Sequence, residues 1–318
     1  AVMPLLGFGQ NEGVGDEIIR MRRCHRAGKS EIIDLHRCGP MRQDPAAAIG
    51  GQPHQVDGDI GFAEAYMDGY CDSPNLAALI ALLAENEKAL GSVAHTNSLH
   101  NLVLRLLHRW HDNSRSGSKR NIHAHYDLGN KFYSLWLDRT MTYSSALFGT
   151  EKSKPLESAQ TDKYERILEQ IGARQGDSIL EIGCGWGGFA ETAARRGMRV
   201  TAVTISKEQL EFARTRLEHA GLADQVDLQF RDYRDIEGQY DHIVSIEMVE
   251  AVGERYWPDY FATLKKHVAP GGSALVQAIV IADDFYEAYR RRPDFIQTYI
   301  FPGGMLLTRQ RIAEQCRK

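Results

Sequence analysis

The chain has 318 residues, 43% of them apolar, with a formal net charge of −4 and a pI near 6.3. This length allows a main domain of roughly 200 residues beside a smaller one, and the mild acidity argues against a general nucleic-acid-binding protein. Five scattered cysteines without C-x-x-C spacing indicate neither a disulfide framework nor a zinc site, so we expect a reducing cytoplasm and no metal.

Residues 58–90 predict two helices with a Ser-Pro entry to the second, whereas residues 1–57 carry little information. Apolar side chains then recur at helical spacing from Leu99 to His111, with basic side chains on the other face and a basic run as far as Arg120. Such a helix can lie on an anionic membrane surface, but a helix that packs against its own protein shows the same pattern. No apolar run approaches the roughly 18 residues that span a bilayer. We therefore expect a cytoplasmic protein, peripheral at the inner face of the membrane.

The stretch from Ser178 to Phe189, S-I-L-E-I-G-C-G-W-G-G-F, predicts a buried strand that turns through a glycine loop into a helix. Gly183, Gly185 and Gly187 fall where the backbone must turn sharply and where a ligand must approach without meeting a Cβ atom. We interpret this stretch as a nucleotide-type loop.

Two cofactor classes fit such a loop, because Gly183, Gly185 and Gly188 also satisfy the G-x-G-x-x-G pattern of dinucleotide-binding proteins. A dinucleotide site, however, places an acid about twenty residues further on, at the end of the second strand. Here that strand ends in Thr204, and the acid, Glu181, instead precedes the loop. A carboxylate in this place suits a cationic ligand better than a pyrophosphate, so we favour S-adenosylmethionine over a nicotinamide or flavin cofactor.

Strands and helices alternate around the loop in the way that a doubly wound sheet requires. The other predicted strands are Arg199–Val203, Val226–Arg231, His242–Ile246 and Ser273–Ile281, with helices at Phe189–Ala194 and Lys207–Ala220. Pro270, Gly271 and Gly272 are interpreted as the turn into the last strand. The pattern predicts an α/β fold with a mainly parallel sheet and a ligand at the carboxyl ends of its strands.

Five motifs stand in an order that is typical of one enzyme family. They are H-Y-D-L-G-N, M-T-Y-S-S-A-L-F, L-E-I-G-C-G-W-G, V-T-I-S-K-E-Q and Y-I-F-P-G-G-M. From about Gly58 onward the chain resembles the cyclopropane-fatty-acyl-phospholipid synthases and the related mycolic acid cyclopropane synthases. The resemblance implies a class I methyltransferase (Rossmann-like) fold with a smaller N-terminal domain. It also implies transfer of a methyl(ene) group from S-adenosylmethionine to the cis double bond of unsaturated acyl chains in membrane phospholipids.

The resemblance also implies a domain organisation. We expect a lipid-associated accessory domain at residues 1–95, a basic amphipathic helix and linker at 96–120, and the methyltransferase domain at 121–318. The family's fold continues into a C-terminal strand pair, which we expect to be missing from this chain.

The resemblance assigns a cofactor role to eleven residues. Tyr126, Tyr143 and Ser144 are expected to border the methionyl end, and Glu181, Gly183 and Gly185 to line the loop. Thr204, Ser206 and Gln209, from T-x-S-x-x-Q, are expected to replace the usual ribose-binding acid, and Asp232 and Tyr233 to meet the adenine.

Four residues are candidates for the chemistry. Glu250, in S-I-E-M-V-E-A-V-G, corresponds to a glutamate that in the family helps hold a bicarbonate ion acting as base. Ser145 and Gln277 stand where the family usually has cysteine and histidine, both also expected to hold the bicarbonate, and Tyr299 of Y-I-F-P-G-G-M completes the set. Replacing histidine by an uncharged amide removes a positive partner of the anion, so the base could be held differently or not at all.

The product and the substrate class therefore stay open between alternatives. The same first methyl transfer leads either to a cyclopropane or to a methylene-branched chain, and a separate reductase could convert the latter to a methyl branch. A methyltransferase of small amines and a non-catalytic lipid-binding relative are the alternative functions, and a homodimer is an expected assembly. The intact glycine loop and Glu250 argue against the non-catalytic alternative.

Overall fold

The computed structural model describes residues 58–86, 117, 129–151 and 153–317. The chain divides into two compact units. Among the described residues the first unit holds 117, 129–151, 153–291 and 300–317, and the second holds 58–86 and 292–299. The predicted amphipathic helix from Leu99 to His111, and the predicted domain boundaries at residues 95 and 120, lie outside the described residues.

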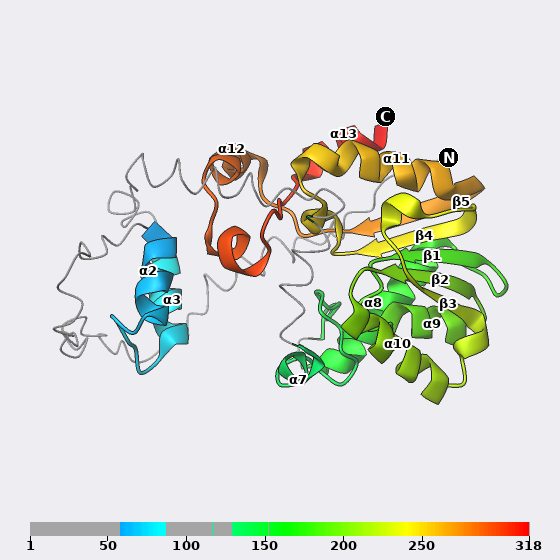
Figure 1. Ribbon diagram of the computed structural model, residues 1–318, viewed down its shortest axis with the longest axis horizontal. Coiled ribbons are helices and arrows are strands. Elements are labelled where there is room, and N and C mark those ends of the chain that lie inside the picture. Colours follow the sequence, from blue (N-terminus) through cyan, green and yellow to red (C-terminus); the bar gives the residue numbers. More distant parts are fainter. Residues whose placement is uncertain (1–57, 87–116, 118–128, 152, 318) are drawn as a thin grey trace. The chain divides into compact units, whose positions relative to one another are not determined.

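The first unit contains a five-stranded parallel sheet with the strand order β3-β2-β1-β4-β5 (Figure 1). Its strands are β1 (Ser178–Ile182), β2 (Arg199–Thr204), β3 (Val226–Phe230), β4 (Tyr240–Ile246) and β5 (Val268–Gln277). The doubly wound α/β fold predicted from the sequence is thus confirmed. The strand order reverses between β1 and β4, which is where such sheets bind their ligands.

Helices cover both faces of this sheet. In Figure 1, α8, α9 and α10 lie on one side, and α11 and α13 lie on the other. The helices of the first unit are α7 (Gly129–Tyr133), α8 (Leu156–Ile171), α9 (Gly188–Arg195), α10 (Lys207–His219), α11 (Trp257–His267), α12 (Asp283–Arg291) and α13 (Arg309–Arg317). Short 3-10 helices lie at Ala223–Gln225, Tyr233–Asp235, Val249–Val252 and Glu254–Tyr256.

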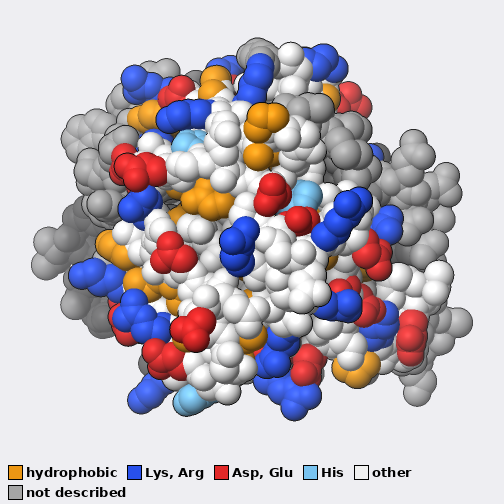
Figure 2. Space-filling view, turned by 90° about the vertical axis from the view of Figure 1, so that its right-hand side faces the viewer, with side chains coloured by type: hydrophobic (Ala, Val, Ile, Leu, Met, Phe, Trp, Pro, Cys, Tyr) orange, Lys and Arg blue, Asp and Glu red, His pale blue; other side chains and the backbone are white. Residues whose placement is uncertain are grey.

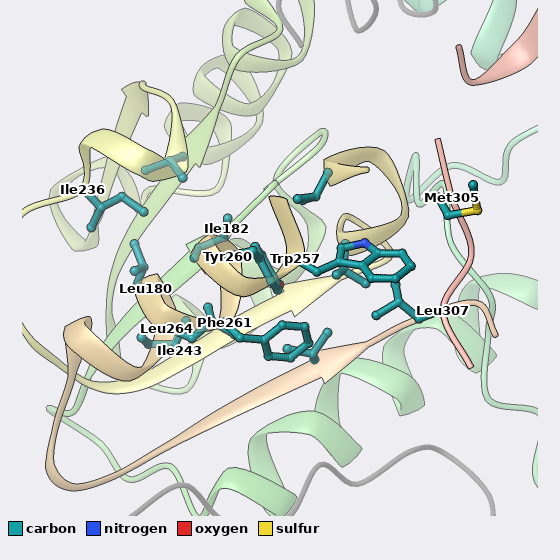
Figure 3. Close-up of a cluster of buried hydrophobic side chains, with 14 of the residues drawn as sticks. Leu180, Ile182, Ile236, Ile243, Trp257, Tyr260, Phe261, Leu264, Met305 and Leu307 are labelled. Atoms are coloured by element: carbon teal, nitrogen blue, oxygen red, sulfur yellow. The ribbon is translucent and has the colours of Figure 1, made fainter. Parts of the chain in front are cut away.

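The side chains of β1 alternate between these two layers, and this alternation determines where the carboxyl of Glu181 lies. Leu180 and Ile182 belong to a buried cluster with Trp257, Tyr260 and other side chains of α11 (Figure 3). Because successive strand residues point to opposite faces, Glu181 points away from this cluster, toward the layer of α8 and α9. Burying the apolar residues of β1 on one face therefore fixes the side of the sheet on which the carboxyl lies.

The prediction for the last strand is wrong at both ends. β5 begins at Val268 rather than Ser273, and the Pro-Gly-Gly stretch lies inside it, where the pairing with β4 shifts register between Tyr240 and His242. A Cβ atom on Gly272 would lie 2.3 Å from the carbonyl oxygen of Asp241, so the two backbones approach too closely for any other residue. β5 also ends at Gln277, although Val280 still forms an isolated bridge with Leu307.

The second unit contains the two helices predicted over residues 58–90. They are α2 (Gly58–Met67) and α3 (Leu76–Glu85). Asn75, directly after the Ser-Pro pair, caps α3, because its side chain accepts a hydrogen bond from the Ala78 backbone at 3.0 Å. A π-helical turn at Ile296–Ile300 begins in this unit.

Candidate active site

A pocket opens at the carboxyl ends of the strands of the first unit, beside the glycine loop. Nine of the eleven predicted cofactor residues line it, and these are Tyr143, Ser144, Glu181, Gly183, Gly185, Thr204, Gln209, Asp232 and Tyr233. Tyr126 lies outside the described residues. Ser206 is not among the lining residues, because its hydroxyl accepts a hydrogen bond from the Gln209 backbone and so caps α10.

The glycine loop has the backbone conformation that the sequence suggested. Gly183 has a φ of +83°, and a Cβ atom there would lie 2.9 Å from the Cγ atom of Met248. Gly185 has a φ of +52° and nothing within 4 Å of its Cβ position, so its open side is available to a ligand. Gly187, with a φ of 83°, begins α9. The loop therefore needs glycine for conformation at each of these positions and, at Gly183, for space as well.

The carboxyl of Glu181 is buried in the pocket wall. Burial away from water raises the pKa of Glu181 to about 8, against the opposing effects of a hydrogen bond from the Ala190 backbone and the charges of Arg216 and Lys163. Its Oε2 atom is buried and has no hydrogen-bond partner among the described residues. A buried carboxyl with an unsatisfied oxygen beside an open glycine loop fits a cationic ligand.

Lys163 of α8, which was not predicted, contacts the pocket through Ser144, although it does not line the pocket itself. Its side chain is buried, its ammonium donates a hydrogen bond to the Ser144 hydroxyl at 2.6 Å, and burial lowers its pKa to about 8. The helical spacing of the sequence could have identified Lys163, because it lies on the buried face of α8 with Gln160, Tyr164 and Ile167. A lysine in the apolar stripe of a helix indicates a specific polar partner.

The T-x-S-x-x-Q motif forms a hydrogen-bonded corner after β2. The Thr204 hydroxyl donates to the Gln209 side chain at 3.0 Å and accepts from the Ser206 backbone at 3.1 Å. The side chains of Thr204 and Gln209 are buried, and both residues line the pocket. This corner stands where a dinucleotide site would present its acid, and it offers neutral groups there.

Asp232 forms an ion pair with Arg234. Arg234 donates to its two carboxylate oxygens from Nε at 2.8 Å and from a terminal nitrogen at 2.7 Å, and both side chains are largely buried. Arg234 also lines the pocket and was not predicted. The guanidinium thus holds the Asp232 carboxylate in place, while Tyr233 lines the same part of the pocket.

An aromatic cluster forms the wall at Tyr143. The ring centroid of Tyr143 lies 5.1 Å from that of Trp136, 5.6 Å from that of Tyr133 and 6.4 Å from that of Phe301, whose ring stacks on Tyr143. Trp186, from the glycine loop, lies 5.0 Å from Tyr133 and donates its indole N–H to Asn130 at 2.7 Å. Aromatic faces attract a cation and exclude water, so this wall suits a sulfonium and an apolar chain.

The structure brings Ser145 and Gln277 together around a carboxylate that was not predicted, that of Glu247. Its Oε1 atom accepts hydrogen bonds from the Ser145 backbone at 2.9 Å, the Ser145 hydroxyl at 2.7 Å and the Gln277 amide at 2.8 Å. Glu247 follows β4 directly, and its φ of 48° lies in the left-handed region. Strained backbone of this kind in a residue other than glycine is found preferentially at functional sites.

Glu250 lies next to this group but does not line the pocket. Its Oε1 atom accepts from the Ile279 backbone, and its Oε2 atom is buried without a hydrogen-bond partner among the described residues. Burial raises the pKa of Glu250 to about 8, and the negative charge of Glu247 acts in the same direction. Tyr299 belongs to the second unit, where its hydroxyl donates to Glu64. The catalytic roles of Glu250 and Tyr299 remain predictions.

Residues 113–318 match the sequence model of the family described as mycolic acid cyclopropane synthetase. A tuberculostearic acid methyltransferase of Mycobacterium tuberculosis is 42% identical over 274 residues, which cover 81% of this chain and 61% of the relative. A cyclopropane-fatty-acyl-phospholipid synthase of Escherichia coli is 35% identical over 263 residues, covering 81% of this chain and 65% of the relative. The chain thus spans less than two thirds of the length of either relative.

A solved structure agrees with these sequence relatives. The structure of a cyclopropane synthase from Mycobacterium tuberculosis superposes with a TM-score of 0.58 at 31% identity, covering 63% of this chain and 73% of that one. The matched family segment includes the glycine loop, the Thr204 corner and the group around Glu247. The chain therefore belongs to the mycolic acid cyclopropane synthetase family.

Proposed function

We propose that this protein transfers a methyl(ene) group from S-adenosylmethionine to the cis double bond of an unsaturated fatty acyl chain. The observation that carries the proposal is the buried, unsatisfied carboxyl of Glu181 in a glycine-loop pocket with an aromatic wall. Such a pocket suits a cationic cofactor and an apolar substrate at the same time. The family and the printed names of its relatives, which act on fatty acids, support this substrate class.

The chain's own residues would divide the work as follows. Glu181 and the glycine loop would hold the cofactor's cationic end, and the Thr204 corner and Asp232 with Tyr233 would hold its nucleoside. When bound, the cofactor supplies an electrophilic methyl group. Tyr143, Trp186 and Phe301 would exclude water and hold the alkene against that methyl, and such positioning can supply roughly 7 to 11 kcal/mol.

The substrate itself can be tested directly. Incubation with methyl-labelled S-adenosylmethionine and phospholipid vesicles that carry cis-unsaturated chains should place the label in the acyl chains, as mass spectrometry of the released fatty acids would show. NMR then distinguishes a cyclopropane, by its upfield protons, from a methylene branch, by its vinylidene protons. Vesicles with saturated chains are the control, because they lack the nucleophile. Label in an added amine, with none in the lipid, would instead support the alternative of an amine N-methyltransferase.

We also propose that the protein reaches its lipid at an anionic membrane surface. On the face shown in Figure 2, basic and acidic side chains are interspersed, so this face offers no single-sign surface for a membrane. Within the described residues, no helix has both the length and the apolar character needed to cross a bilayer. The proposal therefore rests on the basic segment Leu99–Arg120, which lies outside the described residues except for Gly117.

Vesicle sedimentation tests this membrane proposal. Binding to anionic vesicles should exceed binding to neutral ones and should weaken as salt rises, since each basic residue near such a surface contributes about 1 kcal/mol that ions screen. Trp110→Ala combined with Arg105→Ala should reduce the bound fraction. Equal binding to neutral and anionic vesicles would argue against an electrostatic contact.

A further inference from the structure

Ser145 and Gln277, two of the residues expected to hold bicarbonate, already donate hydrogen bonds to a carboxylate of the protein itself, that of Glu247. Three donors of two residues, the Ser145 N–H, the Ser145 hydroxyl and the Gln277 amide, converge on the Oε1 atom of Glu247 at 2.7 to 2.9 Å. The Gln277 amide also donates to the Ser145 hydroxyl at 2.9 Å, which closes a hydrogen-bonded triangle. One carboxylate oxygen thus satisfies donors that would otherwise face an exogenous anion. A bicarbonate ion at these donors does not fit while Glu247 holds them.

The backbone places the Glu247 carboxylate there. Glu247 is the first residue after β4, and its N–H donates to the carbonyl oxygen of Gln277, the last residue of β5, at 2.8 Å. The parallel pairing of β4 with β5 therefore sets the two residues side by side at the edge that forms the pocket. Glu247 itself lines the pocket, and its Oε2 atom accepts no hydrogen bond from the described residues. This leaves one oxygen anchored and the other available to a reacting group.

We propose that Glu247 is the base of the reaction, and that its carboxylate does the work for which a bound bicarbonate would otherwise be needed. This inference rests on the proposed function. In that reaction the alkene uses its π electron pair to bond the methyl carbon, the carbon–sulfur bond breaks with its electron pair going to sulfur, and a carbocation remains on the acyl chain. Glu247 then takes a proton. If the proton leaves the transferred methyl directly, the electron pair of the broken C–H bond closes a cyclopropane. If a hydride first shifts from the chain carbon bearing the methyl to the neighbouring cationic carbon, the cation moves to the methyl-bearing carbon, and loss of a proton from the methyl then forms a methylene double bond.

Glu250 is less suited to this step. It does not line the pocket, and one of its oxygens is held by the Ile279 backbone. Glu250 therefore stays in the group as a neighbour of Glu247, and the two assignments make opposite predictions for their amide variants.

Two substitutions of Glu247 test the proposal by turnover. Glu247→Gln keeps an oxygen acceptor for the Ser145 and Gln277 donors but cannot take a proton, so turnover should fall about 100-fold or more. Binding of S-adenosylmethionine, measured by calorimetry, should change little. Glu211 is exposed on α10, so Glu211→Gln is the matched control for loss of one negative charge. Its turnover should equal that of the unmodified protein. Near-normal turnover of Glu247→Gln, together with loss in Glu250→Gln, would overturn the assignment.

Glu247→Gly gives a gain-of-binding test. The positive φ at this position is relaxed for glycine, so the variant should fold, and the removed side chain frees the three donors for a small anion. We expect ¹³C-bicarbonate to bind the glycine variant but not the unmodified protein, as NMR line broadening would report. Added bicarbonate should also partly restore turnover to the variant, while the unmodified protein should keep full turnover in buffer stripped of carbon dioxide.

The outcomes separate this inference from the proposed function. Bicarbonate binding needs no turnover, so binding by the unmodified protein, or no binding by Glu247→Gly, would overturn the inference whatever the substrate is. Loss of turnover by the unmodified protein in bicarbonate-free buffer would overturn it as well. Failure of the unmodified protein to methylate any unsaturated lipid would instead refute the proposed function.

Discussion

Glu181→Gln should weaken the binding of S-adenosylmethionine by about ten- to a hundredfold above pH 8, the range expected for losing one charge-assisted contact. The buried carboxyl of Glu181 has an unsatisfied oxygen in the pocket that we propose holds the cofactor, and the neutral amide cannot attract a cation in the same way. Calorimetric titration of the cofactor into both proteins measures the difference. Equal affinities above pH 8 would remove Glu181 from the cofactor site.

The same substitution should change the pH dependence of binding. Since burial raises the pKa of Glu181 to about 8, a cation that binds beside it below that pH must first displace a proton. Affinity in the unmodified protein should therefore rise with pH up to about 8, by at most tenfold per pH unit, and binding should release protons. Glu181→Gln lacks this contribution and retains only the titration of the cofactor's own amino group, so the difference between the two proteins should shrink toward pH 6.

The pKa of Glu181 also predicts a change in stability without cofactor. Its ordinary pKa is 4.5, so between pH 4.5 and 8 the folded state binds more protons than the unfolded state. The free energy of unfolding contributed by this group is therefore highest below pH 4.5 and falls as pH rises toward 8. Glu181→Gln should gain stability relative to the unmodified protein over this interval, which thermal unfolding at pH 5 and pH 8 would show.

Gly272→Ala should destabilise the first unit by about 3 kcal/mol or more, a large value for one methyl group. The added Cβ would lie 2.3 Å from the Asp241 carbonyl oxygen and 3.0 Å from that of Ala269. Both are backbone atoms held by the pairing of β4 with β5, so neither can move away without breaking that pairing. Urea unfolding followed by tryptophan fluorescence measures the loss.

The neighbouring Gly271 provides the control for this prediction. Its φ is +82°, but nothing lies within 4 Å of its Cβ position. Gly271→Asn therefore adds conformational strain without a clash, and asparagine tolerates the left-handed region, so the cost should be only about 1 kcal/mol. A similar loss for both variants would mean that backbone conformation, and not the close approach to Asp241, explains the requirement for glycine.

Much of the fold was predictable because its signals are local. The apolar run of β1, the glycines of the loop and the hydroxyl cap of α10 are each set by residues within a few positions of one another. The error at β5 has the opposite origin. Pro270–Gly272 has the composition of a turn, and only the approach of Asp241 from the neighbouring strand shows that this stretch is a shift of register inside a strand.

The sequence by itself determined the sheet, the glycine loop and the position of Glu181 ahead of it, because strand alternation and glycine conformation act over a few residues. The family resemblance also identified Ser145 and Gln277 as unusual, but not the carboxylate to which both of them donate hydrogen bonds. Only the tertiary structure brings these two residues, 132 positions apart, to the same oxygen of Glu247. The physical reason is that the carboxyl ends of parallel β4 and β5 meet at one edge of the sheet, where residues distant in sequence become neighbours.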